Sequence, residues 1–216
     1  MPHQPELAEY PASQGFVPEP TSAHREEPPV RSDVWAEVRK WRMAERERLI
    51  GARLALGAAE RQIRSDRIAG RLDQAIGRFA GRIVGTYWPF RGEPDLRDWG
   101  MDVVQRGGRL ALPVAIRKGW PLEYRIWTPG DPLERDIWNI FVPSCGPAVQ
   151  PDVVIAPVVG FDKRKFRLGY GGGFFDRTLA AMTRKVPAIG VGYAESAVAT
   201  IHPQPHDIPM DVIVTD

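Results

Sequence analysis

The feature that most constrains the fold is a short apolar segment followed by a glycine-rich turn. Residues 153–156 read Val-Val-Ile-Ala, and Pro157 follows them. A run this short and this rich in β-branched residues is typical of a strand buried on both faces of a parallel sheet. Glycines then occur at 169 and 171–173, and apolar residues recur at helical spacing from Phe174 onward. The stretch therefore predicts a buried strand, a loop, a glycine-rich turn and a helix that begins near residue 174.

A glycine-rich turn that leads into a helix favours an anion-binding site. Glycine lets the backbone approach a ligand closely, and the first N–H groups of a helix lie unpaired at the positive end of its dipole. A phosphate is the simplest anion for such a site. The turn lacks the Gly-Lys-Ser/Thr ending of a P-loop, and Phe174 replaces the last glycine of G-x-G-x-x-G. A purely structural turn is therefore an alternative.

Charged residues around the turn favour the phosphate interpretation. Arg167 can hold a phosphate through two hydrogen bonds. Asp176 falls in the first turn of the expected helix, where it can cap the helix or bind Mg²⁺. Asp162 lies on the loop that approaches the turn. An arginine, carboxylates and an anion site together indicate metal-nucleotide chemistry.

Composition places the chain among ordinary soluble globular proteins. It has 216 residues, of which 43% are hydrophobic and 26% charged, and a net charge of +2. The one cysteine, Cys145, excludes an intramolecular disulfide, and we interpret it as a small filler residue. No apolar run is long enough to span a membrane, and the N-terminus lacks a signal-peptide pattern. We therefore expect a cytoplasmic protein with no membrane partner.

The N-terminal part divides into a tail and two helices. Residues 1–31 are rich in proline and lack apolar periodicity, which predicts a disordered tail before a folded domain at 32–216. Apolar spacing predicts one helix from Ser32 or Asp33 to about residue 56 and a second from about 59 to 80.

Lys and Arg outnumber Asp and Glu in the segment 31–82, which raises the alternative of nucleic-acid binding. The arginines are spread around both helices and alternate with acids. Glu60, for example, stands four residues before Arg64, at the spacing of a surface ion pair. We interpret the charges as a solvated surface and expect no nucleic-acid partner.

Strands and helices alternate along the rest of the chain. Residues 128–150 contain four prolines, and the segment is expected to be rich in loops. The pattern predicts an α/β fold with a mostly parallel sheet, right-handed crossovers and an added hairpin. The expected strands are 83–88, 109–116, 122–127, 187–193 and 212–215, the expected helix is 95–106, and the hairpin is 116–127.

Two motifs resemble the signature of the 5-formyltetrahydrofolate cyclo-ligase family, also called methenyltetrahydrofolate synthetase. The first is FD-x-x-x-x-RLGYGGGFFDR at 161–177, and the second is PHDIPMDVIVTD at 205–216. They occur in the family's order, and the resemblance extends over roughly residues 40–216. It implies a three-layer Rossmann-like domain and an enzyme that uses ATP and Mg²⁺ on a folate substrate.

The resemblance implies a nucleotide site around the glycine turn. In the family a basic residue on the first helix, usually lysine, and an arginine four positions later reach the nucleotide. Arg42 and Arg46 fall at these positions, so Arg42 keeps the family's charge but not its shape. We expect catalytic roles for Arg167 and Tyr170. The expected nucleotide-binding residues are Arg42, Arg46, Arg167, Leu168, Gly169, Tyr170, Gly171, Gly172, Gly173, Phe174 and Phe175.

The resemblance also implies a folate site. Glu93 matches a family glutamate that holds the pterin, and a carboxylate can accept two N–H bonds from the pterin edge. Without the family, we would favour interpreting Glu93 as a loop carboxylate or a helix cap. The family has a threonine where this chain has Leu96. The expected substrate-binding residues are Trp88, Glu93, Trp138, Tyr170 and Phe174.

Asp176 and Asp207 are the Mg²⁺ ligands that the resemblance implies. Asp162 and Asp211 are also suitable by residue type, and spacing alone does not choose among the four. We expect His206 to orient a neighbour or lie at the surface rather than act as a base.

The implied reaction converts 5-formyltetrahydrofolate to 5,10-methenyltetrahydrofolate. MgATP phosphorylates the formyl oxygen, N10 closes the ring, and phosphate and ADP are released. Such chemistry needs positioning and charge neutralisation rather than a covalent nucleophile. The departures at Leu96 and Arg42 leave an alternative, a non-ligase paralogue that binds nucleotide or folate in a regulatory or other cofactor-related role. We expect a monomer or a weak dimer.

Overall fold

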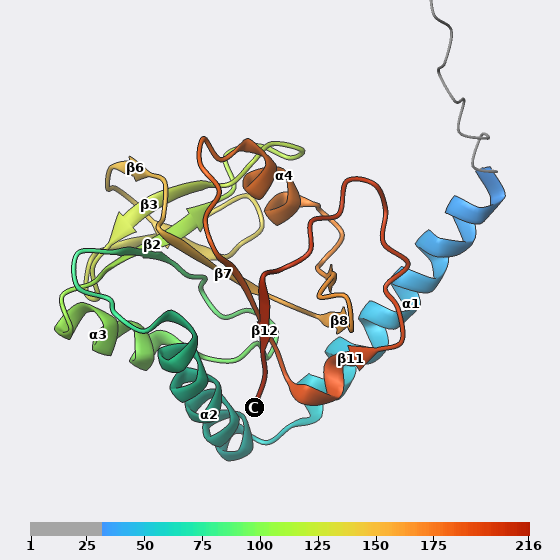
Figure 1. Ribbon diagram of the computed structural model, residues 1–216, viewed down its shortest axis with the longest axis horizontal. Coiled ribbons are helices and arrows are strands. Elements are labelled where there is room, and N and C mark those ends of the chain that lie inside the picture. The colour runs from blue at the N-terminus through green and yellow to red at the C-terminus, as the bar shows by residue number, and fades with distance from the viewer. Residues whose placement is uncertain (1–31) are drawn as a thin grey trace, which may run out of the picture.

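A seven-stranded sheet lies at the centre of the computed structural model, which describes residues 32–216 (Figure 1). The tail expected at 1–31 lies outside the described residues. The strands are β1 (Ile83–Gly85), β2 (Arg109–Val114), β3 (Glu123–Trp127), β6 (Ala148–Val149), β7 (Val153–Pro157), β10 (Ala188–Val191) and β12 (Val212–Val214).

The strand order is β12-β10-β7-β1-β2-β3-β6. All neighbours from β12 to β2 are parallel, whereas β3 and β6 add to the edge in antiparallel fashion. The predicted mostly parallel sheet and its added hairpin are therefore confirmed.

Helices cover both faces of this sheet. They are α1 (Ser32–Ala55), α2 (Ala58–Ile76), α3 (Arg97–Gln105) and α4 (Phe174–Ala181). α2 and α3 pack on one face through Ile68, Leu72 and Val103. α4 packs on the other face through Phe175 and Leu179. The fold is thus the predicted three-layer α/β arrangement.

The all-apolar sequence of β7 follows from this burial on both faces. Val153 and Ile155 contribute to the core beneath α2 and α3. Val154 and Ala156 contribute to the clusters beneath α4. Successive side chains of a strand point to opposite faces, so a strand covered on both sides needs apolar residues at every position.

α1 runs along the side of the molecule, next to a small second sheet (Figure 1). This sheet has the order β11-β8-β9 and consists of β8 (Gly160–Asp162), β9 (Arg167–Leu168) and β11 (Ala197–Val198). The C-terminal half of α1 is attached through Leu49 and Ile50, which pack with Val159, Leu168 and Ile201.

The segment 128–150, predicted to be rich in loops, also contains short strands that the sequence analysis did not identify. The segment contains β6 and a two-stranded ladder of β4 (Leu133–Arg135) and β5 (Phe141–Pro143). Asp136 organises the connecting turn, because its Oδ1 accepts the N–H groups of Trp138 at 2.8 Å and Ile140 at 3.1 Å. Strands of two or three residues leave too little periodicity to be recognised among prolines.

Several predicted elements are shorter in the structure. α2 ends at Ile76 rather than near 80, because Gly77 takes a φ of 76° and its N–H bonds to the carbonyl of Asp73. Phe79 is still buried in the core beyond this end, which explains why apolar spacing continued past the helix. The predicted pair of Glu60 and Arg64 is present at 2.7 Å.

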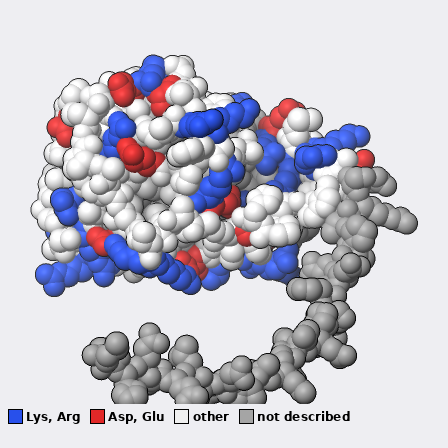
Figure 2. All heavy atoms as spheres, turned by 90° about the horizontal axis from the view of Figure 1, so that it is seen from above, with Lys and Arg blue, Asp and Glu red and all other residues white. Residues whose placement is uncertain are grey.

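Charges of both signs lie close together on the face seen in Figure 2, where Asp and Glu occur among the Lys and Arg side chains. Within residues 32–216, no helix combines the length and apolar character needed to cross a bilayer.

We expect Gly85→Ala to lower the free energy of unfolding by about 1–3 kcal/mol, because it overpacks the interior. A Cβ at residue 85 would lie 2.7 Å from Cγ of Pro151 and 2.9 Å from Cε1 of Tyr124. Gly70→Ala is the matched control, since a Cβ there meets nothing within 4 Å. It should raise stability by up to about 1 kcal/mol through helix propensity. Urea denaturation measures both, and equal stability of the two variants would contradict the packing.

Candidate active site

Two loops meet at the carboxyl ends of the adjacent parallel strands β1 and β7. The loop after β1 carries Glu93, and the hairpin β8–β9 after β7 leads into the glycine turn at 169–173. Ligands of open α/β sheets bind outside this edge. The turn needs glycine at two positions, because Gly171 has a φ of 94° and Gly173 a φ of 62°.

α1 lies against the glycine turn through Arg46. Its Nε donates to the carbonyl of Gly169 at 2.6 Å. A Cβ at residue 171 would lie 3.3 Å from Cζ of Arg46. Burial lowers the pKa of Arg46, and the neighbouring positive charge of Arg42 acts in the same direction. The two expected nucleotide-binding arginines of α1 therefore lie near each other beside the glycine turn.

Arg167 lies buried beneath this turn. Its Nη2 pairs with Oδ2 of Asp176 at 2.9 Å, and its guanidinium lies 4.9 Å from the centre of the Phe175 ring. Burial lowers the pKa of Arg167, and Asp176 opposes that shift. Its Nε has no hydrogen-bond partner among residues 32–216. A buried N–H donor without a partner costs free energy, and an anion at this position would satisfy it.

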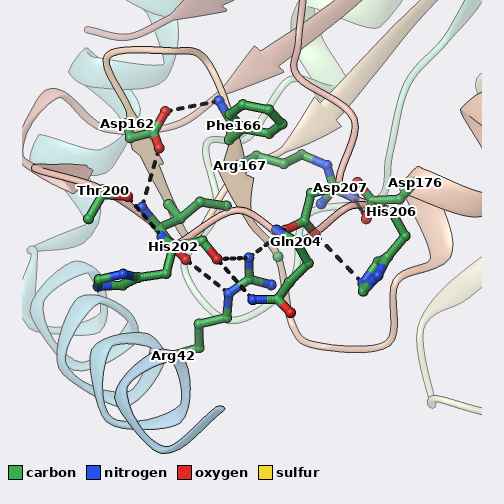
Figure 3. Close-up of polar contacts among 12 residues, drawn as sticks. Arg42, Asp162, Phe166, Arg167, Asp176, Thr200, His202, Gln204, His206 and Asp207 are labelled. Atoms are coloured by element: carbon green, nitrogen blue, oxygen red, sulfur yellow. Dashed lines mark hydrogen bonds and ion pairs between the residues drawn. The ribbon is translucent and has the colours of Figure 1, made fainter. Parts of the chain in front are cut away.

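The second predicted metal ligand, Asp207, is also paired with an arginine (Figure 3). Arg42 forms an ion pair with Oδ2 of Asp207, and it donates to the carbonyls of Ile201 at 2.9 Å and His202 at 3.0 Å. His206 is largely exposed, and its Nε2 lies 4.0 Å from Oδ1 of Asp207. This position fits the surface histidine that the sequence suggested.

Asp176 of α4 contacts the C-terminal segment next to Asp207. Oδ1 of Asp176 accepts the N–H of Ile208, the residue that follows Asp207, at 3.2 Å. No group of three or more His, Cys, Asp or Glu side chains within residues 32–216 is arranged to hold a metal. Mg²⁺ commonly uses one or two carboxylates and takes its other oxygens from phosphates and water. Two carboxylates beside a glycine turn that is expected to bind phosphate therefore fit a Mg²⁺–nucleotide.

Asp162 and Asp211 have structural partners instead. Oδ1 of Asp162 accepts the N–H groups of Arg164 at 2.9 Å and Phe166 at 3.2 Å, and its Oδ2 accepts that of Ile201 at 3.3 Å (Figure 3). Oδ2 of Asp211 accepts the N–H of Ala188 at 2.8 Å. Asp176 and Asp207 also accept backbone N–H groups, of Ile208 and Gln204 respectively. Unlike Asp162 and Asp211, however, both act to raise the pKa of Arg167 at the glycine turn, which favours them as the metal-binding pair.

Glu93 is the centre of a second, buried group. Its Oε2 accepts the N–H of Phe90 at 2.9 Å, and its Oε1 accepts the hydroxyl of Tyr170 at 3.0 Å. Burial raises the pKa of Glu93 to about 7, although the positive charge of Arg53 opposes the shift. Tyr170 belongs to the glycine turn, so this hydrogen bond joins the expected nucleotide and folate sites.

Arg53 is a site residue that the sequence analysis missed. Only 4% of its surface is exposed. Its Nη2 lies 3.8 Å from Oε1 of Glu93 and also donates to the hydroxyl of Tyr170. A signal was available, because Arg53 follows Arg42 and Arg46 at spacings that keep all three on one face of a helix.

Tyr124 was also missed as a site residue. Its hydroxyl is buried without a partner among residues 32–216. The charge of the nearby Arg167 acts to lower the pKa of this tyrosine, against the larger effect of burial, which raises it. Nothing in the alternating pattern of β3 distinguishes this ring from an ordinary core residue.

The expected aromatic residues fall into two places. Trp138 is exposed and packs edge-on against Phe174 at the glycine turn, with ring centres 6.0 Å apart. Trp88 instead packs edge-on against Phe141 at 5.7 Å. Trp88 and Glu93 line a cavity of about 370 Å³ beside α2. Leu168 is buried in the core, so only its backbone can face a nucleotide.

Comparison with known proteins gives a consistent result. Residues 38–216 match the model of the 5-formyltetrahydrofolate cyclo-ligase family. A 5-formyltetrahydrofolate cyclo-ligase of Escherichia coli strain K12 is 30% identical over 139 residues, which span 61% of this chain and 76% of that protein. One from Mycoplasma pneumoniae is 37% identical over 78 residues, 36% of this chain and 44% of that protein.

Solved structures give the same fold. A 5,10-methenyltetrahydrofolate synthetase from Aquifex aeolicus superposes with a TM-score of 0.67 at 26% identity, covering 80% of this chain and 88% of that one. One from Mycoplasma pneumoniae has a TM-score of 0.66 at 23% identity, covering 81% of this chain and 98% of that one.

The raised pKa of Glu93 predicts a pH dependence of stability. The native state keeps the Glu93 proton up to about pH 7, whereas an ordinary glutamate loses it near 4.5. The native state therefore binds more protons within this window, and its stability falls as the pH rises from about 4.5 to about 7. Glu93→Gln carries no titrating group, so wild type should lose stability relative to this variant over that range.

Urea denaturation at a series of pH values measures this difference between the two proteins. Glu47→Gln, at an exposed position on α1, controls for the loss of one carboxylate. The raised pKa of Glu93 would be contradicted if the stability of wild type relative to Glu93→Gln stayed constant or increased from pH 4.5 to 7.

Proposed function

This chain belongs to the 5-formyltetrahydrofolate cyclo-ligase family, and on this premise we propose that it converts 5-formyltetrahydrofolate to 5,10-methenyltetrahydrofolate using ATP and Mg²⁺. The observation that carries the proposal is the hydrogen bond of 3.0 Å between Tyr170 of the glycine turn and the buried Glu93. It supports two adjacent sites, one for phosphate and one for a planar N–H donor. Phosphoryl transfer from bound ATP to bound folate requires the two sites to be adjacent.

The nucleotide site neutralises the triphosphate in this proposal. Backbone N–H groups of the glycine turn and the guanidinium groups of Arg42 and Arg46 face the phosphates. The Nε–H of Arg167, which has no partner among the described residues, donates to a phosphate oxygen. ATP supplies the phosphoryl group that makes the formyl oxygen a good leaving group, so the protein needs no nucleophile of its own.

Asp176 and Asp207 are the carboxylates that would hold Mg²⁺. Each is paired with an arginine, Arg167 and Arg42 respectively. The two carboxylates would supply oxygen ligands to the cation, which would neutralise phosphate charge, and the guanidinium groups beside them would neutralise further phosphate oxygens. The C-terminal segment thus contributes to the same site as the glycine turn.

The folate site is built around Glu93. In its ionised form, the carboxylate accepts two N–H bonds from the aminopyrimidinone edge of the pterin. One of them replaces the hydroxyl of Tyr170 at Oε1. Trp138 and Phe174 offer aromatic faces beside the turn. With the pterin fixed at one end, the formyl group is oriented toward the phosphate site, and N10 of the substrate then closes the ring.

Absorbance in the near ultraviolet tests the activity, because the methenyl product has a conjugated bridge that the substrate lacks. We expect a rise on mixing protein, 5-formyltetrahydrofolate and MgATP, and no rise without ATP or with a chelator of Mg²⁺. Glu93→Ala should raise KM for the folate on the order of 100-fold, since it removes charge-assisted hydrogen bonds. Glu47→Ala is the exposed control.

The outcome distinguishes the two candidate functions. No rise for the wild-type protein would contradict ligase activity. If calorimetry then detected folate or nucleotide binding, the non-ligase alternative would be supported.

Asp176→Asn tests the metal site. The amide keeps the shape but removes the charge, so the Mg²⁺ concentration for half-maximal activity should rise by about tenfold or more. Asp98→Asn, at an exposed position in α3, is the control. An unchanged Mg²⁺ requirement in Asp176→Asn would contradict the metal role. Thermal melting of both variants separates this effect from a loss of folding.

A further inference from the structure

Arg53 lies where α1, the loop after β1 and the glycine turn meet. Its side chain is 4% exposed, and that of Glu93 is 3% exposed. Nε donates to the carbonyl of Arg91 at 2.8 Å, and Nη2 reaches the carbonyl of Phe90 at 3.4 Å. Nη2 also lies 3.8 Å from Oε1 of Glu93 and bonds to the hydroxyl of Tyr170. The guanidinium therefore contacts both loops of the site.

Burying the charged guanidinium of Arg53 carries a desolvation cost. Removing an arginine from water costs several kcal/mol unless charges and hydrogen bonds compensate. Within the described residues, the carboxylate that compensates Arg53 is Glu93, and the remaining partners are two carbonyls and a hydroxyl. An apolar residue would fill the same place between α1 and the loop without this cost.

We propose that Arg53 is a positioning residue for the folate: it holds the Glu93 carboxylate as an anion and keeps the Tyr170 hydroxyl beside it. This inference rests on the proposed function of Glu93 as the group that binds the pterin edge. Arg53 does not touch the substrate. It acts through the charge and orientation of its two neighbours.

The arrangement also prepares the exchange that substrate binding requires. Oε1 of Glu93 accepts the hydroxyl of Tyr170, and that oxygen must become available to a pterin N–H. When the Tyr170 hydroxyl leaves Oε1, the carbonyl of Phe90, 3.3 Å from it, can accept its O–H, and Arg53 still donates to its oxygen. The hydroxyl therefore keeps hydrogen-bond partners, which lowers the cost of opening the folate site.

The charge on Glu93 is set by groups from three elements. Arg53 of α1 favours the ionised form, and so does the hydrogen bond from Tyr170 of the glycine turn. Tyr87, which follows β1, is fully buried and hydrogen-bonds to the carbonyl of Pro94. Across the cavity that Glu93 lines, Arg61 of α2, Asp95 and Arg97 are the other charged groups. Of these, Arg53 is the cation that contacts the carboxylate.

Calorimetric titration with 5-formyltetrahydrofolate from pH 5.5 to 9 tests the proposal without relying on turnover. Wild type should bind more weakly below about pH 7, where Glu93 becomes protonated. Arg53→Met removes the opposing charge, so this loss of affinity should begin about one pH unit higher or more. Arg53→Lys keeps the charge and should restore the wild-type profile. Glu93→Gln should bind weakly at every pH.

Arg48→Met is the matched control, because Arg48 is an exposed arginine of α1 that pairs only with Glu45 among the described residues. It should reproduce the wild-type profile. If Arg53→Met does not fold, as judged by circular dichroism, Arg53→Gln removes the charge while keeping hydrogen-bond donors and is titrated in its place.

Two results would overturn the proposal. One is a charge-removing variant whose affinity changes with pH as in wild type. The other is an equal loss at all pH values in Arg53→Met and Arg53→Lys, which a merely structural role would produce. Failure of the proposed function is distinguishable, because wild type would then show no absorbance rise with MgATP, or no folate binding at any pH.

Discussion

The ion pairs and hydrogen bonds from one face of α1 are the interactions on which the site depends. Arg42, Arg46 and Arg53 reach the C-terminal segment, the glycine turn and the loop after β1, respectively. Leu49 and Ile50 attach the same helix to the small sheet through apolar contacts. Without this helix, the glycine turn would lose Arg46, and Glu93 would be a buried carboxylate without the counter-charge of Arg53. The central sheet brings the loops to one edge, and the arginines of α1 connect them into a site.

Each acidic group in the site is already paired with a basic one. Asp207 is paired with Arg42, Asp176 with Arg167, and Glu93 with Arg53. Charges held in place by packing need little reorganisation when a ligand arrives, because new partners replace existing ones rather than bulk water. In the proposal, the triphosphate replaces carboxylates as the partner of the arginines, and the divalent cation replaces arginines as the partner of the carboxylates. The N–H groups of the pterin edge replace the Tyr170 hydroxyl as a donor to Glu93.

Much of this arrangement was predictable from sequence, because local patterns determine it. The run 153–156 identified a strand buried on both faces, and the two family motifs identified the glycine turn and the C-terminal segment. What sequence could not supply was the environment of each carboxylate. Asp162 and Asp176 are equivalent by residue type, and the structure separates them by their partners. Asp162 accepts N–H groups of its own loop, whereas Asp176 pairs with the buried Arg167.

The environment of Arg53 could not be predicted from the sequence either. A charged residue on an amphipathic helix is normally exposed, so its burial depends on loops that lie far away in the sequence. Tyr124 was missed for a related reason. Its place in an alternating strand indicated a core ring, whereas the position of its hydroxyl near Arg167 depends on how β3 and β9 are placed in space.

The contacts of Arg42 have a consequence for the order in which the molecule is completed. Its partners Ile201, His202 and Asp207 lie 159 to 165 residues further along the chain. During synthesis α1 therefore leaves the ribosome well before the residues that close the site. Loop-closure entropy also delays contacts of such separation in refolding. A nascent chain that has formed most of its central sheet therefore still lacks the nucleotide site, and a short C-terminal truncation would remove the site while leaving most of the sheet intact.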